Sequence, residues 1–412
     1  MNDAPVDSGD EPEQSAPVPI LREPRDGVPE PLTDPERLAQ LAASLERGDG
    51  PVALDAERAS GYRYSQRAYL VQLRRAGTGT ALIDPIALPD LSGVNTAIGD
   101  AEWILHAAGQ DLPCLAEVGL RPARLFDTEL AGRLLGDERV ALGTMVERHL
   151  GVALEKVHSA VDWSTRPLAY DWLAYAALDV ELLVDLRTVL GQELERTGKS
   201  EWAAQEFEAV RSAGPPPARA EPWRRTSGIH RVRSRHQLAA VRALWEARDE
   251  YAAERDIAPG RVLPDAAIID AAQNNPAHER DLLALPVFGG PRQRRRAGRW
   301  FGALEAARAL QEGELPALTG PGDGVPATSR WRERDPAAAA RLAAARDVIN
   351  RLAAEHTVLA QNLLASDAVR RLCWEPPQPL TEDSIRSRLA DVGARPWQID
   401  LSASPLAAAL AE

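Results

Sequence analysis

Cysteines are scarce in this sequence, and long apolar runs are absent. The 412 residues include two cysteines, Cys114 and Cys373, which alone cannot build a disulfide framework or a thiolate zinc site. No apolar run approaches the roughly 18 residues that a membrane-spanning helix needs. The first twenty residues are acidic and proline-rich and lack the apolar core of a signal peptide. These absences predict a cytoplasmic protein with no membrane partner.

Basic residues are also in the minority. Lysine and arginine number 48 against 61 aspartates and glutamates, so the net charge is -13. This balance excludes a uniformly basic nucleic-acid binder but allows a local basic patch. The hydrophobic content of 44% is ample for sizeable cores, and the length allows two to four domains at roughly 100–200 residues each.

Breaker-rich segments divide the chain into three folded blocks. Strand-like runs at residues 51–58, 68–75 and 80–85 precede helix-like runs, which is typical of an α/β domain. The two later blocks each show a long amphipathic helix, a short helix after a loop and another helix, which suggests a tandem repeat of small helical bundles. The expected divisions are a disordered acidic tail (1–31), a first domain (32–212), a linker (213–228), a helical domain (229–313), a linker (314–330) and a second helical domain (331–412).

Two glycines separate the second and third strand-like runs. Gly77 and Gly79 could belong to a phosphate-binding loop, but no third glycine follows and the segment leads into a strand. A hairpin turn is therefore the preferred interpretation.

Acidic residues interrupt several apolar segments. Asp55 and Glu57 alternate with apolar neighbours, so on a strand both carboxylates point to the same face. Taken alone, such a pair is most simply a solvated strand face. Asp111 and Asp127 each stand near the expected start of a helix, where an aspartate most often caps the helix.

Asp179 is harder to explain as a structural residue. It lies in the alanine- and leucine-rich stretch 172–183, which predicts a core helix, and aspartate is a poor helix former. Tyr175 stands four residues earlier and so projects from the same helix face. A carboxylate on an apolar face needs a partner, and a divalent cation such as Mg²⁺ or Mn²⁺ would be a suitable one.

The order of these residues resembles the DEDD superfamily of 3′→5′ exonucleases, in the subgroup with a tyrosine in its last motif. Asp55 and Glu57 match the first motif, Asp111 the second, and Tyr175 with Asp179 the third. The connecting segments "AYLVQL", "FDTELAGRLLG" and "VDWSTRPL" resemble those of the ribonuclease D family. Residues 263–272 and 285–304 resemble the HRDC domain, a helical module, and the last block looks like a second, more diverged copy.

The resemblance implies a fold, a cofactor and a set of roles. The first domain should have an RNase H-like mixed sheet with flanking helices, followed by two all-α HRDC-like bundles. Asp55, Glu57 and Asp179 would hold one divalent ion, Asp55 and Asp111 would hold a second, and Tyr175 would orient the attacking water.

Some residues depart from the family pattern or compete with it. Ala56 and Arg58 replace residues that are often threonine and apolar in the family, which affects the expected nucleotide pocket and leaves the carboxylates intact. Other superfamily members use a histidine five residues before the last aspartate. His158 and Asp162 are one residue too close for that motif, so Tyr175 with Asp179 is preferred.

The nucleic-acid contacts are less well defined by the sequence. His106 is either a structural histidine or a contact to substrate. Two arginine-rich segments could bind phosphates, or could simply be solvated, and Trp223 or Trp300 could stack a base. The arginines are Arg224, Arg225, Arg231, Arg233 and Arg235 in the first segment, and Arg292, Arg294, Arg295, Arg296 and Arg299 in the second.

The resemblance thus predicts a monomeric two-metal exoribonuclease that acts on single-stranded RNA 3′ ends of the tRNA precursor class. Two alternatives stay open: the same chemistry on DNA 3′ ends, and a scaffold that binds nucleic acid without cleaving it.

Overall fold

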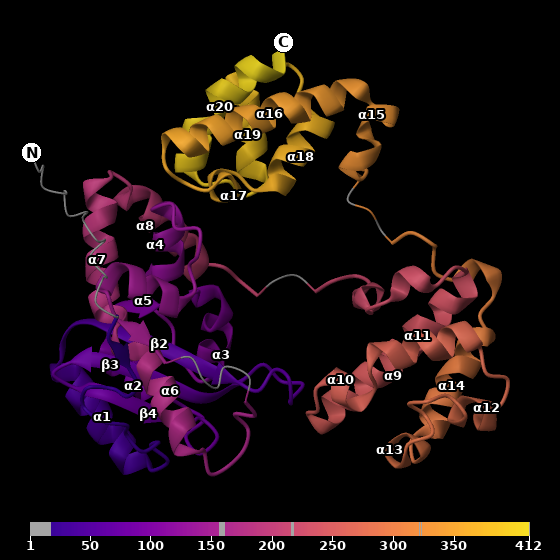
Figure 1. Ribbon diagram of the computed structural model, residues 1–412, viewed down its shortest axis with the longest axis horizontal. Coiled ribbons are helices and arrows are strands. Elements are labelled where there is room, and N and C mark those ends of the chain that lie inside the picture. Colours follow the sequence, from indigo (N-terminus) through magenta and orange to yellow (C-terminus); the bar gives the residue numbers. More distant parts are fainter. Residues whose placement is uncertain (1–17, 156–160, 216–217, 321, 323, 412) are drawn as a thin grey trace, which may run out of the picture.

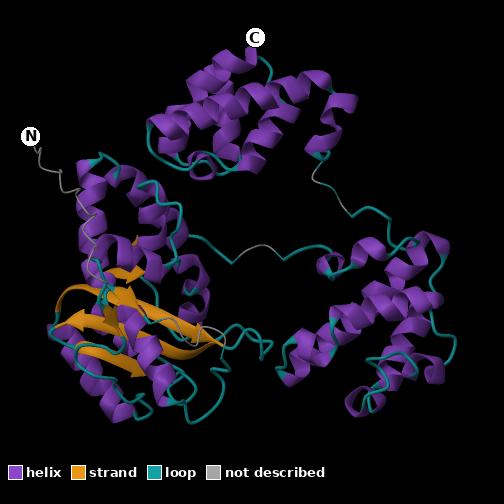
Figure 2. Cartoon of the chain, viewed as in Figure 1, coloured by secondary structure: helices purple, strands orange, loops and turns teal. Residues whose placement is uncertain are grey.

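The first domain is built around a mixed five-stranded sheet. The computed structural model describes residues 18–155, 161–215, 218–320, 322 and 324–411. Figure 2 draws the strands of this sheet in orange. The strand order is β4-β3-β2-β5-β6; β3 runs antiparallel to its neighbours β2 and β4, and β2, β5 and β6 run parallel. The strands are β2 (Asp49–Arg58), β3 (Ala68–Ala76), β4 (Gly79–Ile83), β5 (Glu102–Leu105) and β6 (Arg124–Asp127). The predicted α/β architecture with a mixed sheet is confirmed.

Helices surround this sheet (Figure 1). They are α1 (Pro35–Arg47), α2 (Ser92–Ile98), α3 (Leu112–Glu117), α4 (Thr128–Leu134), α5 (Leu142–Leu150), α6 (Tyr170–Glu181), α7 (Leu183–Arg196) and α8 (Ser200–Arg211). The central strand β2 is buried continuously from Val52 to Leu54 because apolar residues pack on both of its faces. Ala53 faces α6 and α7, where it packs against Val180 and Leu183.

The glycine-containing segment between β3 and β4 is a hairpin turn, as expected. The Thr78 N–H donates to the Arg75 carbonyl over 3.1 Å. Gly77 and Gly79 have φ angles of 78° and 79°, a region that residues with a side chain rarely adopt.

Part of the segment expected to be a disordered tail, residues 1–31, is ordered. Residues 1–17 lie outside the described part of the chain, but β1 (Ile20–Leu21) pairs in parallel with β7 (Ala153–Leu154). The Arg25 side chain also lies 3.9 Å from the buried carboxylate of Glu181. Arg74 donates to Asp26 as well, so contacts with residues far away in the sequence order this segment, which explains why its proline-rich composition predicted disorder.

The rest of the chain forms two all-α bundles. The first contains α9 (Arg235–Arg255), α10 (Pro259–Val262), α11 (Asp265–Asn274), α12 (Glu279–Leu283), α13 (Pro291–Arg294) and α14 (Ala297–Arg308). The second contains α15 (Trp331–Arg334), α16 (Pro336–Glu355), α17 (Ala360–Leu363), α18 (Ser366–Trp374), α19 (Glu382–Asp391) and α20 (Pro396–Ala411). Helix lengths of 21, 4 and 10 residues for α9, α10 and α11 nearly repeat as 20, 4 and 9 for α16, α17 and α18. The predicted common layout is therefore present.

Both bundles contact the first domain. The Ala258 N–H of the first bundle donates to the Tyr62 carbonyl over 2.9 Å, and Trp397 of the second bundle donates its indole N–H to Glu206 on α8 over 2.9 Å. None of the helices in the described ranges has both the length and the apolar character to cross a membrane.

Candidate active site

Strand β2 and helix α6 bring the first and third motifs together. Side chains alternate along a strand, so Asp55 and Glu57 share with Ala53 the face that α6 and α7 cover. On α6, Val180 packs against Ala53, which fixes the neighbouring Asp179 next to the end of β2. The apolar residues of α6 thus serve the site by holding the helix against this strand.

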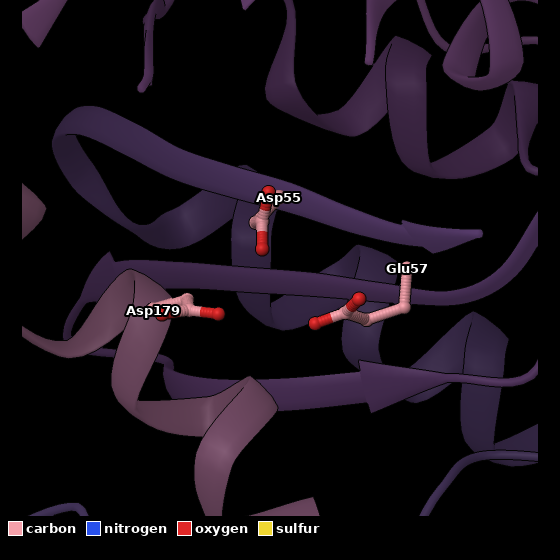
Figure 3. Close-up of side chains that lie close together, drawn as sticks. All are labelled: Asp55, Glu57 and Asp179. Carbon is pink, nitrogen blue, oxygen red and sulfur yellow. The ribbon is translucent and has the colours of Figure 1, made fainter. Parts of the chain in front are cut away.

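Three carboxylates converge at this position. Asp55, Glu57 and Asp179 each offer an oxygen atom, and these oxygens all lie within 4.8 Å of one another. The three side chains point toward a common space between the strand and the helix (Figure 3). All three are partly exposed, so the group is accessible from solvent.

The site favours protonated carboxyl groups when no cation is present. Burial raises the pKa of Asp55 to about 6, with the Ala56 N–H and Arg58 acting in the opposite direction. Burial raises the pKa of Glu57 well above its usual value, and repulsion from Asp55 and Asp179 adds to the effect. The pKa of Asp179 is raised well above its usual value by burial and by the charge of Asp55.

Tyr175 lies beside this group, one helical turn before Asp179. Its hydroxyl is hydrogen-bonded to the Asp179 carboxylate. Burial and the neighbouring carboxylates raise the pKa of Tyr175 above its usual value of 10, so the phenol stays neutral at physiological pH. A neutral phenol can donate one hydrogen bond and accept others, which suits it to orient a water molecule.

Asp111 occupies the expected position at the start of α3 but does not cap the helix through its side chain. Its buried carboxylate lies 3.5 Å from the Arg58 guanidinium. Burial and repulsion from Asp55 raise the pKa of Asp111 to about 8, and Arg58 opposes this shift. The charge of Asp111 in turn raises the pKa values of Glu57 and Asp179, which places the second motif in the same electrostatic environment.

Asp127 is a helix cap, as the sequence predicts. Its carboxylate accepts hydrogen bonds from the Glu129 and Leu130 N–H groups at the start of α4, and from those of Ala107 and Ala108. These four donors satisfy the buried carboxylate, so Asp127 ties the segment after β5 to α4.

The sequence raised two histidines as candidate site residues, His106 and His158, and the structure describes His106. His106 has partners for both ring nitrogens, the Thr128 hydroxyl at 2.9 Å and the Val140 backbone. Burial lowers the pKa of His106 to about 4, so the ring is neutral. These contacts favour the structural role over a contact to substrate. His158 lies outside the described residues.

The arginine-rich segment after residue 291 belongs to the first helical bundle, and the described contacts of its arginines lie within that bundle. Arg292, Arg294 and Arg295 are exposed, and Arg294 donates to the Gly289 carbonyl. The Arg296 guanidinium lies 4.4 Å from the centre of the Tyr251 ring.

The expectation that Trp223 or Trp300 stacks a base is wrong. Their exposed fractions are 3% and 0%, and both belong to the core of the first bundle. Trp300 donates its indole N–H to Gln293 over 2.9 Å, which satisfies its one polar atom inside the core. Neighbouring arginines suggested a surface position, but the helical period places this tryptophan on the inner face of α14.

Arg58 is the site residue that the sequence did not identify as functional. It was noted as a departure from the family pattern, yet its charge lowers the pKa values of Asp55, Glu57 and Asp111. The sequence feature that could have identified it is its position directly after the paired carboxylates of Asp55 and Glu57.

The residues fit divalent cations. The raised pKa values show that the site holds too little positive charge to stabilise its carboxylates in the ionised form. The carboxylates are partly exposed, and their oxygens are the ligands that hard cations prefer. The described part of the site offers no histidine or cysteine to this group, which suits Mg²⁺ or Mn²⁺ better than zinc.

Comparisons with known proteins agree with this geometry. A model described as a 3′-5′ exonuclease matches residues 29–195, the HRDC domain model matches residues 237–304, and a model for the C-terminal domain of 3′ to 5′ exonucleases matches residues 324–410. A crystal structure of a protein from Bifidobacterium adolescentis is 38% identical, with a TM-score of 0.89 over 96% of this chain and 100% of that one. Escherichia coli RNase D, described as an exoribonuclease involved in structured RNA processing, is 26% identical, with a TM-score of 0.64 over 90% of this chain and 98% of that one.

Curated relatives give the same assignment. Ribonuclease D from Zymomonas mobilis is 34% identical over 69% of this chain and 74% of its own length. Ribonuclease D from Sphingobium indicum is 32% identical over 78% of this chain and 87% of its own length. Similarity at this level, over most of each relative and with the exonuclease and HRDC domains in the same chain, shows that the chain belongs to the ribonuclease D family.

Proposed function

We propose that this chain is a 3′→5′ exoribonuclease that releases nucleoside 5′-monophosphates from single-stranded RNA 3′ ends, with tRNA precursors as the substrate class. The observation that carries the proposal is the convergence of Asp55, Glu57 and Asp179 beside Tyr175. The names of the relatives support RNA as the substrate, since the Zymomonas and Escherichia proteins are both ribonucleases D.

The proposed cofactors are two divalent ions, Mg²⁺ or Mn²⁺. Asp55, Glu57 and Asp179 would hold one of them, and Asp55 with Asp111 would hold the other. When bound, such ions lower the pKa of water and stabilise negative charge on the attacking and leaving oxygens. Asp55 would be shared, which requires a carboxylate with two usable oxygens and explains why a histidine would not serve.

The protein's own groups would position the reactants. The Tyr175 hydroxyl, already bonded to Asp179, would direct the attacking water toward the terminal phosphodiester. Since burial keeps the phenol neutral, its contribution is orientation by hydrogen bonding and not proton abstraction by a phenolate. The closely packed helix α6 would hold phenol and carboxylate in fixed relation.

The same comparisons support a division into three domains. We infer an exonuclease domain, a first HRDC domain and a second HRDC-like domain in the order expected at residues 32–212, 229–313 and 331–412. The family matches support this order, and they begin at residues 29 and 324 for the first and last domains, slightly earlier than expected. A monomeric state, a cytoplasmic location and phosphate contacts by Arg292, Arg294, Arg295 and Arg296 stay predictions.

An Asp179→Asn variant tests the proposal. Loss of one proposed metal ligand should lower nucleotide release from a labelled RNA strand by at least roughly 100-fold, since losing even an indirect metal contact costs about 10–100-fold. Asp171→Asn is a matched control, because Asp171 is exposed on the same helix. Unchanged activity in Asp179→Asn would contradict the metal-ligand role.

The two rival functions need separate measurements. Digestion of matched RNA and DNA strands with Mg²⁺ or Mn²⁺ separates an exoribonuclease from a DNA exonuclease. If the parent protein binds a labelled strand but leaves it intact with either metal, the scaffold function replaces the proposed one.

A further inference from the structure

The contact between Arg58 and Asp111 joins an accessible cation to a buried carboxylate. The guanidinium lies 3.5 Å from a carboxylate oxygen, and the two side chains are 26% and 9% exposed. One partner can thus turn toward solvent while the other cannot leave the site.

The direction of the Arg58 side chain is unusual for a residue at this position of strand β2. Alternation along β2 assigns it to the face of Leu54 and Ala56, opposite Asp55 and Glu57. The pairing of β2 with β3 shifts register between Glu57 and Arg58, where the regular ladder ends. Arg58 is therefore at the last position of the strand, and its long side chain extends toward Asp111.

This ion pair is weakly held in comparison with another in the same domain. Arg166 makes two bonds to Asp84, at 2.6 and 2.9 Å, and also donates to the Tyr69 carbonyl. Such a bidentate arrangement fixes a guanidinium. The contact of Arg58 with Asp111 is a single one, longer than a good hydrogen bond, so a competing cation can displace it at modest cost.

Charge balance indicates what a displaced Arg58 would bind. Under the proposed function, four carboxylates are balanced by two divalent ions, and the guanidinium then leaves one net positive charge. A phosphodiester carries one negative charge, and guanidinium groups bind phosphate oxygens well.

We propose that Arg58 is an exchangeable cation of the site, which pairs with Asp111 in the metal-free protein and with a substrate phosphate once a divalent ion has bound Asp111. This inference rests on the proposed function. It makes Arg58 both a competitor of the second ion and a contact for the substrate, so its removal should affect metal binding and substrate binding in opposite directions.

Calorimetric titration with Mn²⁺, without nucleic acid, tests the first half. Arg58→Met keeps most of the side-chain length and removes the charge, and it should tighten the weaker Mn²⁺ site by on the order of 3- to 10-fold. Arg63→Met is the matched control, since Arg63 lies five residues further on and donates to Ser164 instead. Equal or weaker Mn²⁺ binding by Arg58→Met, relative to the parent, would overturn the inference.

Kinetics with a short RNA strand at saturating Mg²⁺ test the second half. Arg58→Met should raise KM several-fold with a smaller change in kcat, and Arg58→Lys should restore part of the loss because it keeps the charge. An unchanged KM in Arg58→Met would overturn the substrate contact.

The two proposals fail in different ways. If the parent binds no Mn²⁺, the proposed function is wrong and the role of Arg58 fails with it. If the parent binds Mn²⁺ and degrades RNA while Arg58→Met behaves like the parent in both assays, only the role of Arg58 is wrong.

Discussion

Asp256, at the end of α9 in the first helical bundle, accepts a hydrogen bond over 2.8 Å from the Ser65 N–H of the exonuclease domain. The same carboxylate accepts a longer bond from the Tyr69 hydroxyl and lies 3.7 Å from the Arg67 guanidinium. Residues 59–67 connect β2 to β3, so this carboxylate helps to hold the loop that directly follows Asp55 and Glu57, together with the bond from the Ala258 N–H to the Tyr62 carbonyl. The first bundle therefore contacts the loop next to the proposed metal site.

Removal of this carboxylate should loosen the loop. In Asp256→Ala the Ser65 N–H loses its partner, and a lost hydrogen bond of this kind costs about 1–3 kcal/mol. Hydrogen exchange of residues 59–67 should become faster by on the order of 10-fold or more. Asp256→Asn should have a smaller effect, because asparagine keeps an acceptor and tolerates the left-handed φ of 48° at this position.

Asp270→Ala is the control for that experiment, since the Asp270 carboxylate bonds to Asn274 within α11. Exchange rates in the loop should not change in this variant. Equal exchange in the parent and Asp256→Ala would show that other contacts hold the loop.

The stability of the metal-free protein should fall as the pH rises from about 4 to about 8. The pKa values of Asp55 and Asp111 are raised from 3.8 to about 6 and about 8, so the folded chain keeps protons that the unfolded chain has released. Unfolding is then favoured by rising pH, by on the order of 1–3 kcal/mol for Asp55 alone. Melting temperatures with a chelator should therefore be lower near pH 8 than near pH 5.

Added Mg²⁺ should reverse this dependence, because the ion binds the deprotonated carboxylates and stabilises the folded state. Metal-free Asp179→Asn should be more stable than the parent near pH 8, since one of the repelling charges is gone. A parent melting temperature that rises with pH under chelation would contradict the repulsion described for this site.

Tyr175→Phe should lower kcat by roughly 10–100-fold, the range seen when a group that orients a metal-site ligand is lost. Because the pKa of the phenol is raised above 10, the tyrosine should not titrate in the working range, and the pH profiles of parent and variant should have the same shape between about pH 6 and 9. Single-turnover rates across this range provide the measurement. A rise in rate with an apparent pKa near 9 that Tyr175→Phe abolishes would show that the phenolate acts as a base.

Local pattern was sufficient for the elements that carry the motifs. The alternation around Asp55 and Glu57 predicted β2, and the alanine- and leucine-rich stretch predicted α6, where Asp179 lies close to the other two carboxylates. Such patterns are informative because a charged residue within a regular apolar pattern costs free energy unless a partner stabilises it.

Contacts between distant parts of the chain were not predictable in this way. Asp256 has the sequence context of an ordinary helix end, and its partner Ser65 is 191 positions away. Trp300 stands among arginines, yet helix packing within the bundle buries it completely. Arg58 was visible as an unusual residue, but its contact with Asp111 depends on how β2 and α3 meet.

The second bundle docks on the exonuclease domain through Trp397. Its indole ring stacks on Trp202 with ring centres 4.7 Å apart, its N–H donates to Glu206, and its backbone N–H donates to Gln205. Only 2% of Trp397 is exposed, so Trp397→Ala should cost about 3–5 kcal/mol at this contact. Scanning calorimetry should then show the second bundle unfolding in a separate, earlier transition.

Trp374→Ala distinguishes loss of docking from loss of stability within the bundle. Trp374 packs on Trp331 inside the second bundle, with ring centres 5.0 Å apart, so its removal should lower the stability of that bundle while the docking contacts of Trp397 remain. Trp397→Phe keeps an aromatic ring on Trp202 but loses the bond to Glu206, and it should lie between the parent and Trp397→Ala. If Trp397→Ala unfolds in the same transition and at the same temperature as the parent, the stacked pair does not couple the two domains.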